Sequence, residues 1–264
     1  MSQYKTHAII LSRADFREAD RLYIVYTRDF GKLELLARGA RKIESKLAGH
    51  LEPFTIAEIM IGRGKNFDHL AGAEIIEDFE NIKTDFSKMS FLHYCFEVVH
   101  QVTAWEMRDD RIYNLLLELL LTLESFSFPA EATTWEKYQA LTKSFVIKLL
   151  ALLGYAPEVH QCLICKNPIP AKGNIFNMKR GGVVCHHCHS KDLDLPNVKT
   201  DISADAIKVL RFFMNSPTYR ALNLKGNQSP VGETLRIIEK FLSFHLNKPI
   251  ESARFLEMMN EKIH

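Results

Sequence analysis

The period of the hydrophobic residues changes near residue 78, and this change limits what the 264-residue chain can fold into. Between residues 7 and 77, apolar residues alternate in short runs that are separated by turn residues, as in half-buried β-strands. From Phe79 onward the period is about 3.6 residues, which is typical of amphipathic helices. The sequence therefore predicts a small β domain followed by a helical region.

Five runs in the first segment are predicted strands. Glycine-containing loops at residues 28–31 and 62–66 join the second run to the third and the fourth to the fifth, and both are typical of β-hairpins. Five strands with one longer connection, from residue 39 to residue 53, fit a five-stranded OB-type barrel, and they also fit other five-stranded barrels. The runs are His7–Leu11, Arg21–Thr27, Lys32–Arg38, Phe54–Ile61 and Phe67–Ile76.

The rest of the chain predicts helices on both sides of an insert that contains cysteines, so the fold class is α+β and multidomain. Gly154 and Pro157 are expected to end the third helix, and Ser229-Pro230 to begin the fifth. The expected domains are the barrel (1–80), a helical domain in two parts (81–158 and 193–264) and the insert (159–192). The expected helices span residues 86–107, 111–126, 133–153, 203–215, 229–246 and 252–259.

Composition and charge exclude several classes of protein. With 47% hydrophobic and 25% charged residues, the chain has the usage of a folded protein and not of a disordered one. The net charge of +2 is too small for the whole molecule to bind nucleic acid or anionic lipid as a polycation, so any basic site must be local. Asn114, Glu118 and Glu124 interrupt the most apolar stretch, so no membrane-spanning helix is expected. No export signal is apparent, and a cytoplasmic location is predicted.

Four of the five cysteines lie in two tight pairs, Cys162-Leu-Ile-Cys165 and Cys185-His-His-Cys188. The pairs are separated by residues 166–184, a spacing typical of zinc sites. Two residues between thiolates allow a tight turn to place both sulfurs on one ion, and two such turns complete a tetrahedron. A filled four-cysteine site has no open position for water, so one structural Zn²⁺ is predicted, with these four cysteines as its ligands. The fifth cysteine, Cys95, is expected to pack in the core.

The insert leaves two alternatives open. His186, His187 or His189 could replace a cysteine and give a site of three cysteines and one histidine. The insert is also cationic, and its bases either offset the charge of the thiolates or contact phosphate as well. These bases are Lys166, Lys172, Lys179, Arg180 and Lys191. A zinc deaminase is disfavoured, because neither cysteine pair follows a proline and a cysteine is expected in the fourth metal position.

A basic segment lies between the third and fourth predicted strands. It contains Arg38, Arg41, Lys42 and Lys46 against one acid, Glu44, in a loop whose small residues allow close backbone approach. Arg63 and Lys65 add two cations in the second hairpin. Proteins that bind single strands combine a cationic groove with exposed aromatic side chains. The segment therefore predicts nucleic-acid binding, and solvated surface charge is the alternative for each base.

Two aromatic residues are candidates for stacking on bases. If Leu22, Ile24 and Tyr26 form the core face of the second strand, Tyr23 lies on the opposite, exposed face. Phe67, at the end of a hairpin, is the second candidate, with a core position as the alternative. Tyr23 is therefore predicted to belong to the nucleic-acid site.

Several blocks of residues, in order along the chain, resemble the RecO family of bacterial recombination mediators and DNA repair proteins. The blocks cover residues 7 to about 190, and the helices that follow match only in general character. They are IIL at 9–11, FREADR at 16–21, YTRDFGK at 26–32, ARGARK at 37–42, LEPF at 51–54, LGYAP at 153–157, CLIC at 162–165 and GGVVCHHC at 181–188.

The resemblance implies an OB-fold DNA-binding domain, a helical domain and a zinc-binding insert. It also implies binding of single- and double-stranded DNA and annealing of complementary strands coated by single-strand binding protein. With the partner RecR, such a protein helps RecA to load onto those strands, without catalysing a reaction. Arg38, Arg41, Lys42 and Lys46 resemble the DNA-contacting basic loop of the family, and a nucleoid-associated location in the bacterial cytoplasm follows.

Two rival interpretations belong to other classes. A zinc-ribbon interaction scaffold without DNA activity would share the cysteine pattern. An enzyme is disfavoured, because the sequence contains no carboxylate cluster near the cysteines and no motif for nucleotide hydrolysis, dinucleotide binding or an α/β-hydrolase. The sequence therefore predicts a non-enzymatic DNA-binding protein.

Overall fold

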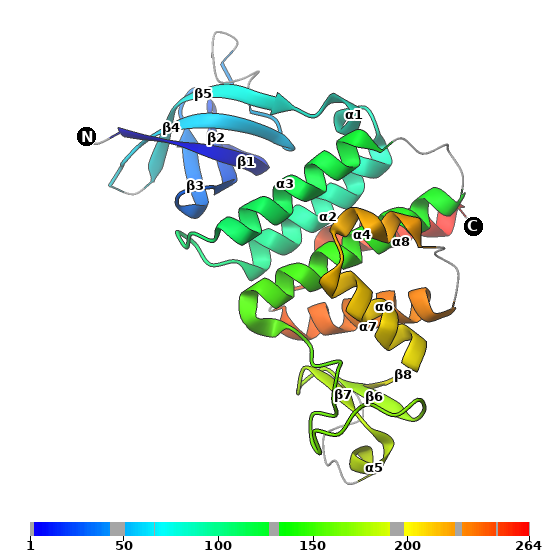
Figure 1. Cartoon of the computed structure of the whole chain (residues 1–264). Helices are drawn as coiled ribbons and strands as arrows, with labels where there is room; N and C mark the ends of the chain where they lie inside the picture. Colours follow the sequence, from blue (N-terminus) through cyan, green and yellow to red (C-terminus); the bar gives the residue numbers. More distant parts are fainter. Residues whose placement is uncertain are drawn as a thin grey trace. The chain divides into compact units, whose positions relative to one another are not determined.

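The computed structural model describes residues 3–42, 51–65, 67–126, 132–190, 198–224, 229–246 and 248–263. The chain forms two compact units, Met1–Ser127 and Phe128–His264. The first unit contains a five-stranded barrel and three helices, and the second contains the remaining helices and the insert (Figure 1). The domains expected from the sequence group the first three helices with the later ones instead, and they stay a prediction.

The barrel has the strand order β1-β2-β3-β5-β4 and closes on itself through pairing of β1 with β4. All pairings are antiparallel except that of β3 with β5, a short parallel seam formed by Leu35 with Asp68 and Leu36 with His69. This is the five-stranded arrangement of the OB-fold, which confirms the predicted fold class. The strands are β1 (Gln3–Phe16), β2 (Asp20–Thr27), β3 (Gly31–Ala37), β4 (Thr55–Gly62) and β5 (Asp68–Asp78).

Strand β1 is much longer than the apolar run that predicted it. Its first half, from Gln3 to Ile9, pairs with β4, and its second half, from Ala8 to Phe16, pairs with β2. A register shift between Ile10 and Ser12 lies within the pairing with β2. The polar ends of the strand carry no apolar alternation, so the sequence pattern covered only the central part, which both partners share.

Tyr23 corrects the predicted orientation of β2. The residue is fully buried, at 0% exposure, and belongs to the barrel core with Val25, Leu35 and Ile59. Leu22 and Ile24 lie on the outer face and are partly exposed. Both faces of this strand carry apolar residues, so alternation could not determine which face points inward. Tyr23 therefore packs inside the barrel, and the predicted exposure for base stacking is wrong.

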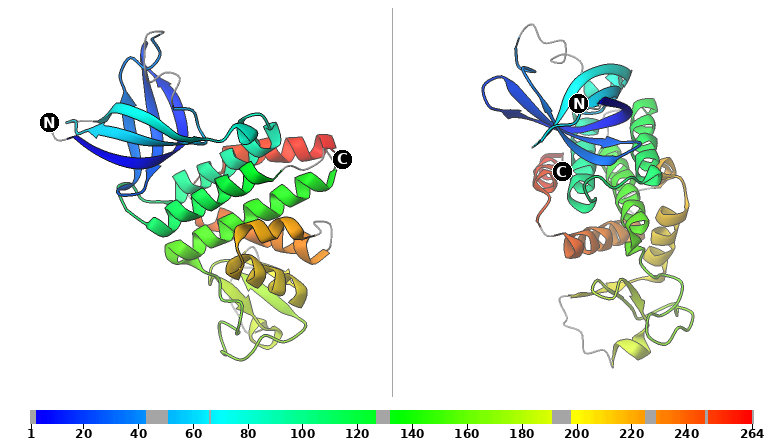
Figure 2. Two further views of the ribbon diagram at one scale, coloured as in Figure 1. Left: turned by 45° about the horizontal axis from the view of Figure 1, so that its top comes forward. Right: turned by 90° about the vertical axis from the view of Figure 1, so that its left-hand side faces the viewer.

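Helices α1 (Glu80–Lys83), α2 (Phe86–Val102) and α3 (Asp110–Ser125) complete the first unit, with α2 and α3 side by side (Figures 1 and 2). Asp85 and Asp109 cap α2 and α3 by accepting hydrogen bonds from the first backbone N–H groups. The sequence pattern predicted that α2 continues to residue 107, whereas it ends at Val102. The helix ends where Thr103 takes an extended conformation, and Lys32 from the barrel binds the carbonyl groups of His100 and Thr103 at this end.

The second unit contains a core of helices and a small sheet. Helix α4 (Ala132–Leu150) continues into a π-helical turn, Ala151–Tyr155, in which Gly154 has a φ of 92° and ends the helix as predicted. The sheet has the order β7-β6-β8, with α5 beside it, and projects from the helices of this unit (Figure 2). The other elements are β6 (Asn174–Asn177), β7 (Gly182–Val184), α5 (His186–His189), β8 (Lys199–Ile202), α6 (Ala204–Asn215), η3 (Thr218–Asn223), α7 (Ser229–His245) and α8 (Glu251–Ile263).

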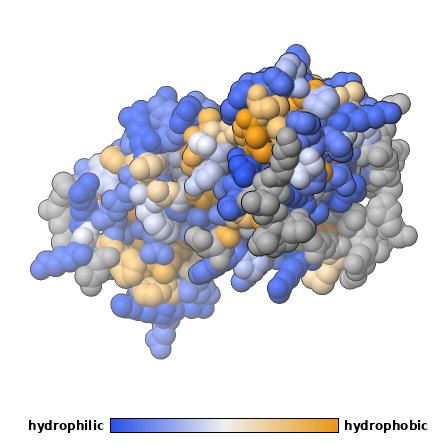
Figure 3. Space-filling view, turned by 90° about the horizontal axis from the view of Figure 1, so that it is seen from below, coloured by the Kyte–Doolittle hydropathy of each residue, from blue (hydrophilic) through white to orange (hydrophobic). Residues whose placement is uncertain are grey.

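Figure 3 shows how hydropathy is distributed over the described residues on one face of the molecule. Hydrophobic side chains there gather in a few groups that hydrophilic residues separate. Of the helices in the described part of the chain, none is both long and apolar enough to cross a membrane.

Candidate nucleic-acid interface and metal centre

The four paired cysteines come together in the second unit. Their sulfur atoms all lie within 4.8 Å of one another, and Sγ of Cys165 is 3.9 Å from Sγ of Cys185. Four sulfurs at about 2.3 Å from one tetrahedral ion are separated by about 3.8 Å. Cys162, Cys165, Cys185 and Cys188 therefore form a cluster that can hold a metal ion, as predicted.

Tight turns place the sulfurs of each pair. In the first pair, Lys166 donates its backbone N–H to the carbonyl of Cys162 and takes a left-handed conformation with φ of 61°. In the second pair, Cys185 precedes α5, and Cys188 lies within this helix and donates its N–H to the carbonyl of Cys185. Val184 and Leu163 pack against the cluster and shield it. The local geometry is thus that of two cysteine turns facing each other.

Hydrogen bonds and burial act in opposite directions on the thiols of the cluster. Burial raises the pKa of Cys162, but backbone N–H groups of Cys185, Cys165 and Ile164 lower it more, to about 6. Burial and the neighbouring thiols raise the pKa of Cys188 to about 12. A bound cation would hold all four thiols deprotonated, because a coordinating thiol loses its proton.

The histidines of the insert lie outside the cluster. His186 and His187 are exposed, His189 is half-buried, and the metal-binding group found among the described residues consists of the four cysteines alone. The geometry thus favours four sulfur ligands over three sulfurs and one nitrogen. Lys166, Lys172, Lys179 and Arg180 of the insert are exposed, and Lys191 lies outside the described residues.

The basic loop after β3 presents three cations. Arg38, Arg41 and Lys42 are exposed, whereas Lys46 lies in residues 43–50, outside the described part of the chain. The turn is formed by Gly39, which has a φ of 65° and donates its N–H to the Asp20 carboxylate. The predicted cations that the structure describes are therefore on the surface, as DNA binding requires.

Contacts connect this loop to two other loops of the barrel. The backbone N–H of Arg41 bonds the carbonyl of Ala19, and its side chain reaches the carbonyl of Arg17, both in the β1–β2 loop. The guanidinium of Arg38 lies 3.3 Å from Nε2 of His69, at the start of β5. The rings of Phe16 and Phe67 are 6.0 Å apart and connect the β1–β2 loop with the β4–β5 hairpin. Three loops of the barrel thus form one continuous surface.

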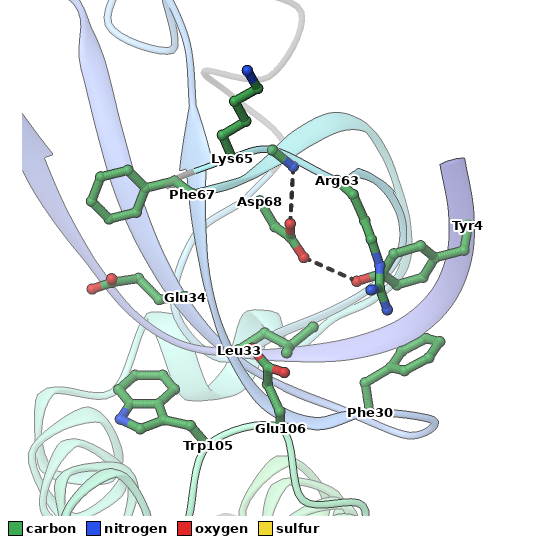
Figure 4. Close-up of a pocket in the computed structure, with 11 residues that line it drawn as sticks. Tyr4, Phe30, Leu33, Glu34, Arg63, Lys65, Phe67, Asp68, Trp105 and Glu106 are labelled. Atoms are coloured by element: carbon green, nitrogen blue, oxygen red, sulfur yellow. Dashed lines mark hydrogen bonds between the residues drawn. The ribbon is translucent and has the colours of Figure 1, made fainter. Parts of the chain in front are cut away.

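The β4–β5 hairpin carries Arg63 and Lys65, both exposed, on one side of a hollow of about 660 Å³ (Figure 4). The guanidinium of Arg63 lies 5.8 Å from the centre of the Tyr4 ring. Asp68 shapes the hairpin by accepting hydrogen bonds from the N–H of Gly64 and the hydroxyl of Tyr4. Phe67 is partly exposed and lines the hollow, so it is not an interior core residue.

Sequence reasoning missed Trp105, which lines the same hollow and is 47% exposed. The residue lies in the predicted extension of α2, where a tryptophan at helical spacing reads as core. A signal was present in the polar residues that follow, since Asp109 is a typical cap for the next helix and implies a break before it. The break places Trp105 in a loop beside the barrel.

Comparison with known proteins agrees with this architecture. The family model "Recombination protein O N terminal" matches residues 1–79, and "Recombination protein O C terminal" matches residues 83–254. The chain belongs to the RecO family. The resemblance seen in the sequence blocks is thereby confirmed.

Three relatives show how far the similarity extends. The chain is 31% identical over 257 residues to the DNA repair protein RecO of Dehalococcoides mccartyi, which covers 97% of this chain and 96% of the relative. It is 30% identical over 261 residues to that of Desulforudis audaxviator, covering 98% of each chain. It is 29% identical over 261 residues to that of a Roseiflexus species, covering 98% of this chain and 87% of the relative. The similarity therefore includes both units.

Proposed function

We propose that this RecO-family chain is a non-enzymatic mediator that binds single- and double-stranded DNA and anneals complementary strands coated by single-strand binding protein. With RecR, it promotes the loading of RecA, and it acts in the cytoplasm at the nucleoid. The basic surface of the barrel supports the proposed binding of DNA, and the family resemblance supports the proposed protein partners. The four-cysteine cluster would hold one structural Zn²⁺.

The observation that carries DNA binding is the connection of the three barrel loops. Arg38, Arg41 and Lys42 are exposed on this surface, with Arg63 and Lys65 in the adjoining hairpin. Phosphate oxygens attract such cations, and the released counterions make the affinity depend on salt. Annealing requires two phosphate backbones to approach each other, and a cationic surface lowers their mutual repulsion while the bases stay free to pair.

We expect that replacing Arg38, Arg41, Lys42 and Lys46 together with alanine weakens binding of a fluorescent single-stranded oligonucleotide. The logarithm of the affinity falls by about 0.7 per contacted phosphate for each tenfold rise in salt. The slope of the salt titration should therefore decrease by up to about 3 in the variant. Strand annealing, measured in the same solution with a labelled complementary strand, should slow in parallel.

A matched control removes the same charge from exposed positions of the second unit. It replaces two arginines and two lysines with alanine and should leave affinity and salt slope unchanged. An unchanged slope in the barrel variant would contradict the assignment of the basic loop. If the unmodified protein shows no salt-dependent DNA binding at all, the interaction scaffold is the correct interpretation. The control residues are Lys208, Arg220, Lys248 and Arg254.

A further inference from the structure

The hollow beside the β4–β5 hairpin, which we call the Trp105 hollow, has features that DNA binding by the basic loop does not explain. It lies between this hairpin, β3 and the loop after α2, and its volume is about 660 Å³ (Figure 4). A hollow of this size can hold one nucleobase with its sugar. Its lining combines aromatic rings with charges of both signs.

The indole of Trp105 is held in place although it is 47% exposed. The ammonium of Lys32 lies 4.3 Å from the ring centre, and the ring of His100 lies 5.6 Å away. The backbone is fixed as well, because the N–H of Glu106 bonds the carbonyl of Lys32 at 2.9 Å. A flat aromatic surface that is both rigid and exposed loses little entropy when a base stacks on it.

The charged residues that line the hollow are two cations, Arg63 and Lys65, and three acids, Glu34, Asp68 and Glu106. The Asp68 carboxylate already accepts hydrogen bonds from Tyr4 and Gly64. Arg63 and Lys65 come from the exposed hairpin, where phosphate groups can reach them. Glu34 is the exposed position between the buried residues Leu33 and Leu35 of β3, and Figure 4 shows it between Phe67 and Trp105. A carboxylate repels phosphate and accepts hydrogen bonds from amino groups. The hollow is therefore suited to the base of a nucleotide, with its phosphate at the hairpin.

We propose that the Trp105 hollow binds one unstacked nucleobase of a single strand, which stacks on Trp105 and donates its exocyclic amine to the carboxylate of Glu34. Cytosine, adenine and guanine carry such an amine and thymine does not, and carboxylates accept hydrogen bonds from the cytosine amine in known complexes. Glu106 has a different position, since it acts electrostatically on Tyr4 at the other side of the hollow. The inference rests on the proposed DNA binding and adds a base preference to it.

The test compares three probes of equal length: oligo-dC, oligo-dT and an abasic backbone. The unmodified protein should bind oligo-dC several-fold more tightly than oligo-dT, and oligo-dC should quench the fluorescence of Trp105. Trp135, the second tryptophan, is 3% exposed and should contribute little to the quenching. Trp105→Ala should weaken oligo-dC binding about fivefold or more, since stacking on one aromatic residue contributes at least this much. Its affinity for the abasic strand should not change, and Trp105→Phe should restore most of the loss.

The variant Glu34→Ala separates the preference for oligo-dC over oligo-dT from the stacking on Trp105. We expect equal affinity for oligo-dC and oligo-dT in this variant, because the acceptor for the amine is gone. Equal affinity of the unmodified protein for oligo-dC and oligo-dT, or an equal loss for the abasic strand in Trp105→Ala, would overturn the proposal. In both cases, salt-dependent binding through the basic loop would still stand. Failure to bind all three probes would instead overturn the proposed function itself.

Discussion

Replacing Cys162 with serine is expected to reduce the bound metal from one ion per chain to none. The sulfur of Cys162 is buried at the centre of the cluster and accepts the N–H of Cys185 at 3.4 Å. A serine hydroxyl keeps its proton at neutral pH and is a poor zinc ligand. The three remaining thiolates would then bind the ion too weakly to retain it during purification. Metal content of the purified protein, measured by elemental analysis, checks this result and identifies the metal.

The loss of metal should unfold the insert and leave the rest of the second unit folded. The apparent binding free energy of zinc in small four-ligand sites is about 10–16 kcal/mol, and much of it is folding free energy. The two strands of the insert, β6 and β7, are four and three residues long and cannot supply this energy. The base of the sheet has a separate anchor, because the ring of Phe176 packs 5.4 Å from that of Phe241 in α7. Limited proteolysis should therefore cut residues 159–190 first.

Two variants serve as controls for the metal centre. Cys95→Ala also removes a buried thiol, but Cys95 lies in α2 of the first unit and should leave the metal content unchanged. His189→Ala tests the mixed ligand set and should also retain the ion. Loss of metal in His189→Ala together with retention in Cys162→Ser would show that the four-sulfur assignment is wrong.

The cysteine cluster and the barrel differ from the nucleic-acid surface in how far the sequence could predict them. The spacing of two cysteine turns determines the cluster locally, so the four ligands follow from the sequence alone. The barrel follows from alternation over five runs. The face of β2 does not, because Tyr23 and Val25 alternate with Leu22 and Ile24, and only pairing with β1 and β3 decides which pair points inward.

Contacts between residues distant in sequence also explain what the patterns omitted in the second unit. Strand β8 follows the insert and pairs with all four residues of β6, and neither short strand was predicted from the sequence. The Trp105 hollow is a similar case, since Trp105 forms a β-bridge with Lys32, more than 70 positions earlier in the chain. A periodic pattern describes one helix or strand at a time and contains no information on contacts between elements that are distant in the sequence.

Lys32→Met is expected to cause the largest loss of stability in the first unit. The ammonium of Lys32 is buried, and it donates hydrogen bonds to the carbonyls of His100 and Thr103, each at 2.5 Å, at the end of α2. Methionine fills a similar volume but donates nothing, so two acceptors at a helix end lose their partner. A buried unsatisfied group costs about 1–3 kcal/mol, and relief of the cost of burying the ammonium offsets part of this loss. The free energy of unfolding should therefore fall by roughly 1–3 kcal/mol.

Amide hydrogen exchange in peptides from α2 measures this effect where it arises. Exchange between residues 96 and 103 should accelerate in Lys32→Met, because the end of the helix opens more often. Lys42→Met is the matched control, since it makes the same substitution at an exposed position of the same unit. Equal exchange in both variants would show that Lys32 does not hold the end of α2.

Lys32 should also make the free energy of unfolding depend on pH, and the direction of this dependence follows from its pKa. Burial lowers the pKa of Lys32 from 10.5 to about 8. Between about pH 8 and pH 10.5 the unfolded chain therefore binds more protons than the folded one, so the free energy of unfolding contributed by this group rises with pH. Below pH 8 both states are protonated, and the cost of burying the charge is constant. As pH rises from 8 to 10, the free energy of unfolding of the unmodified protein should therefore increase relative to that of Lys32→Met. Parallel pH profiles of the two proteins would contradict the lowered pKa and indicate that the carbonyls and the Trp105 ring fully offset the cost of burial.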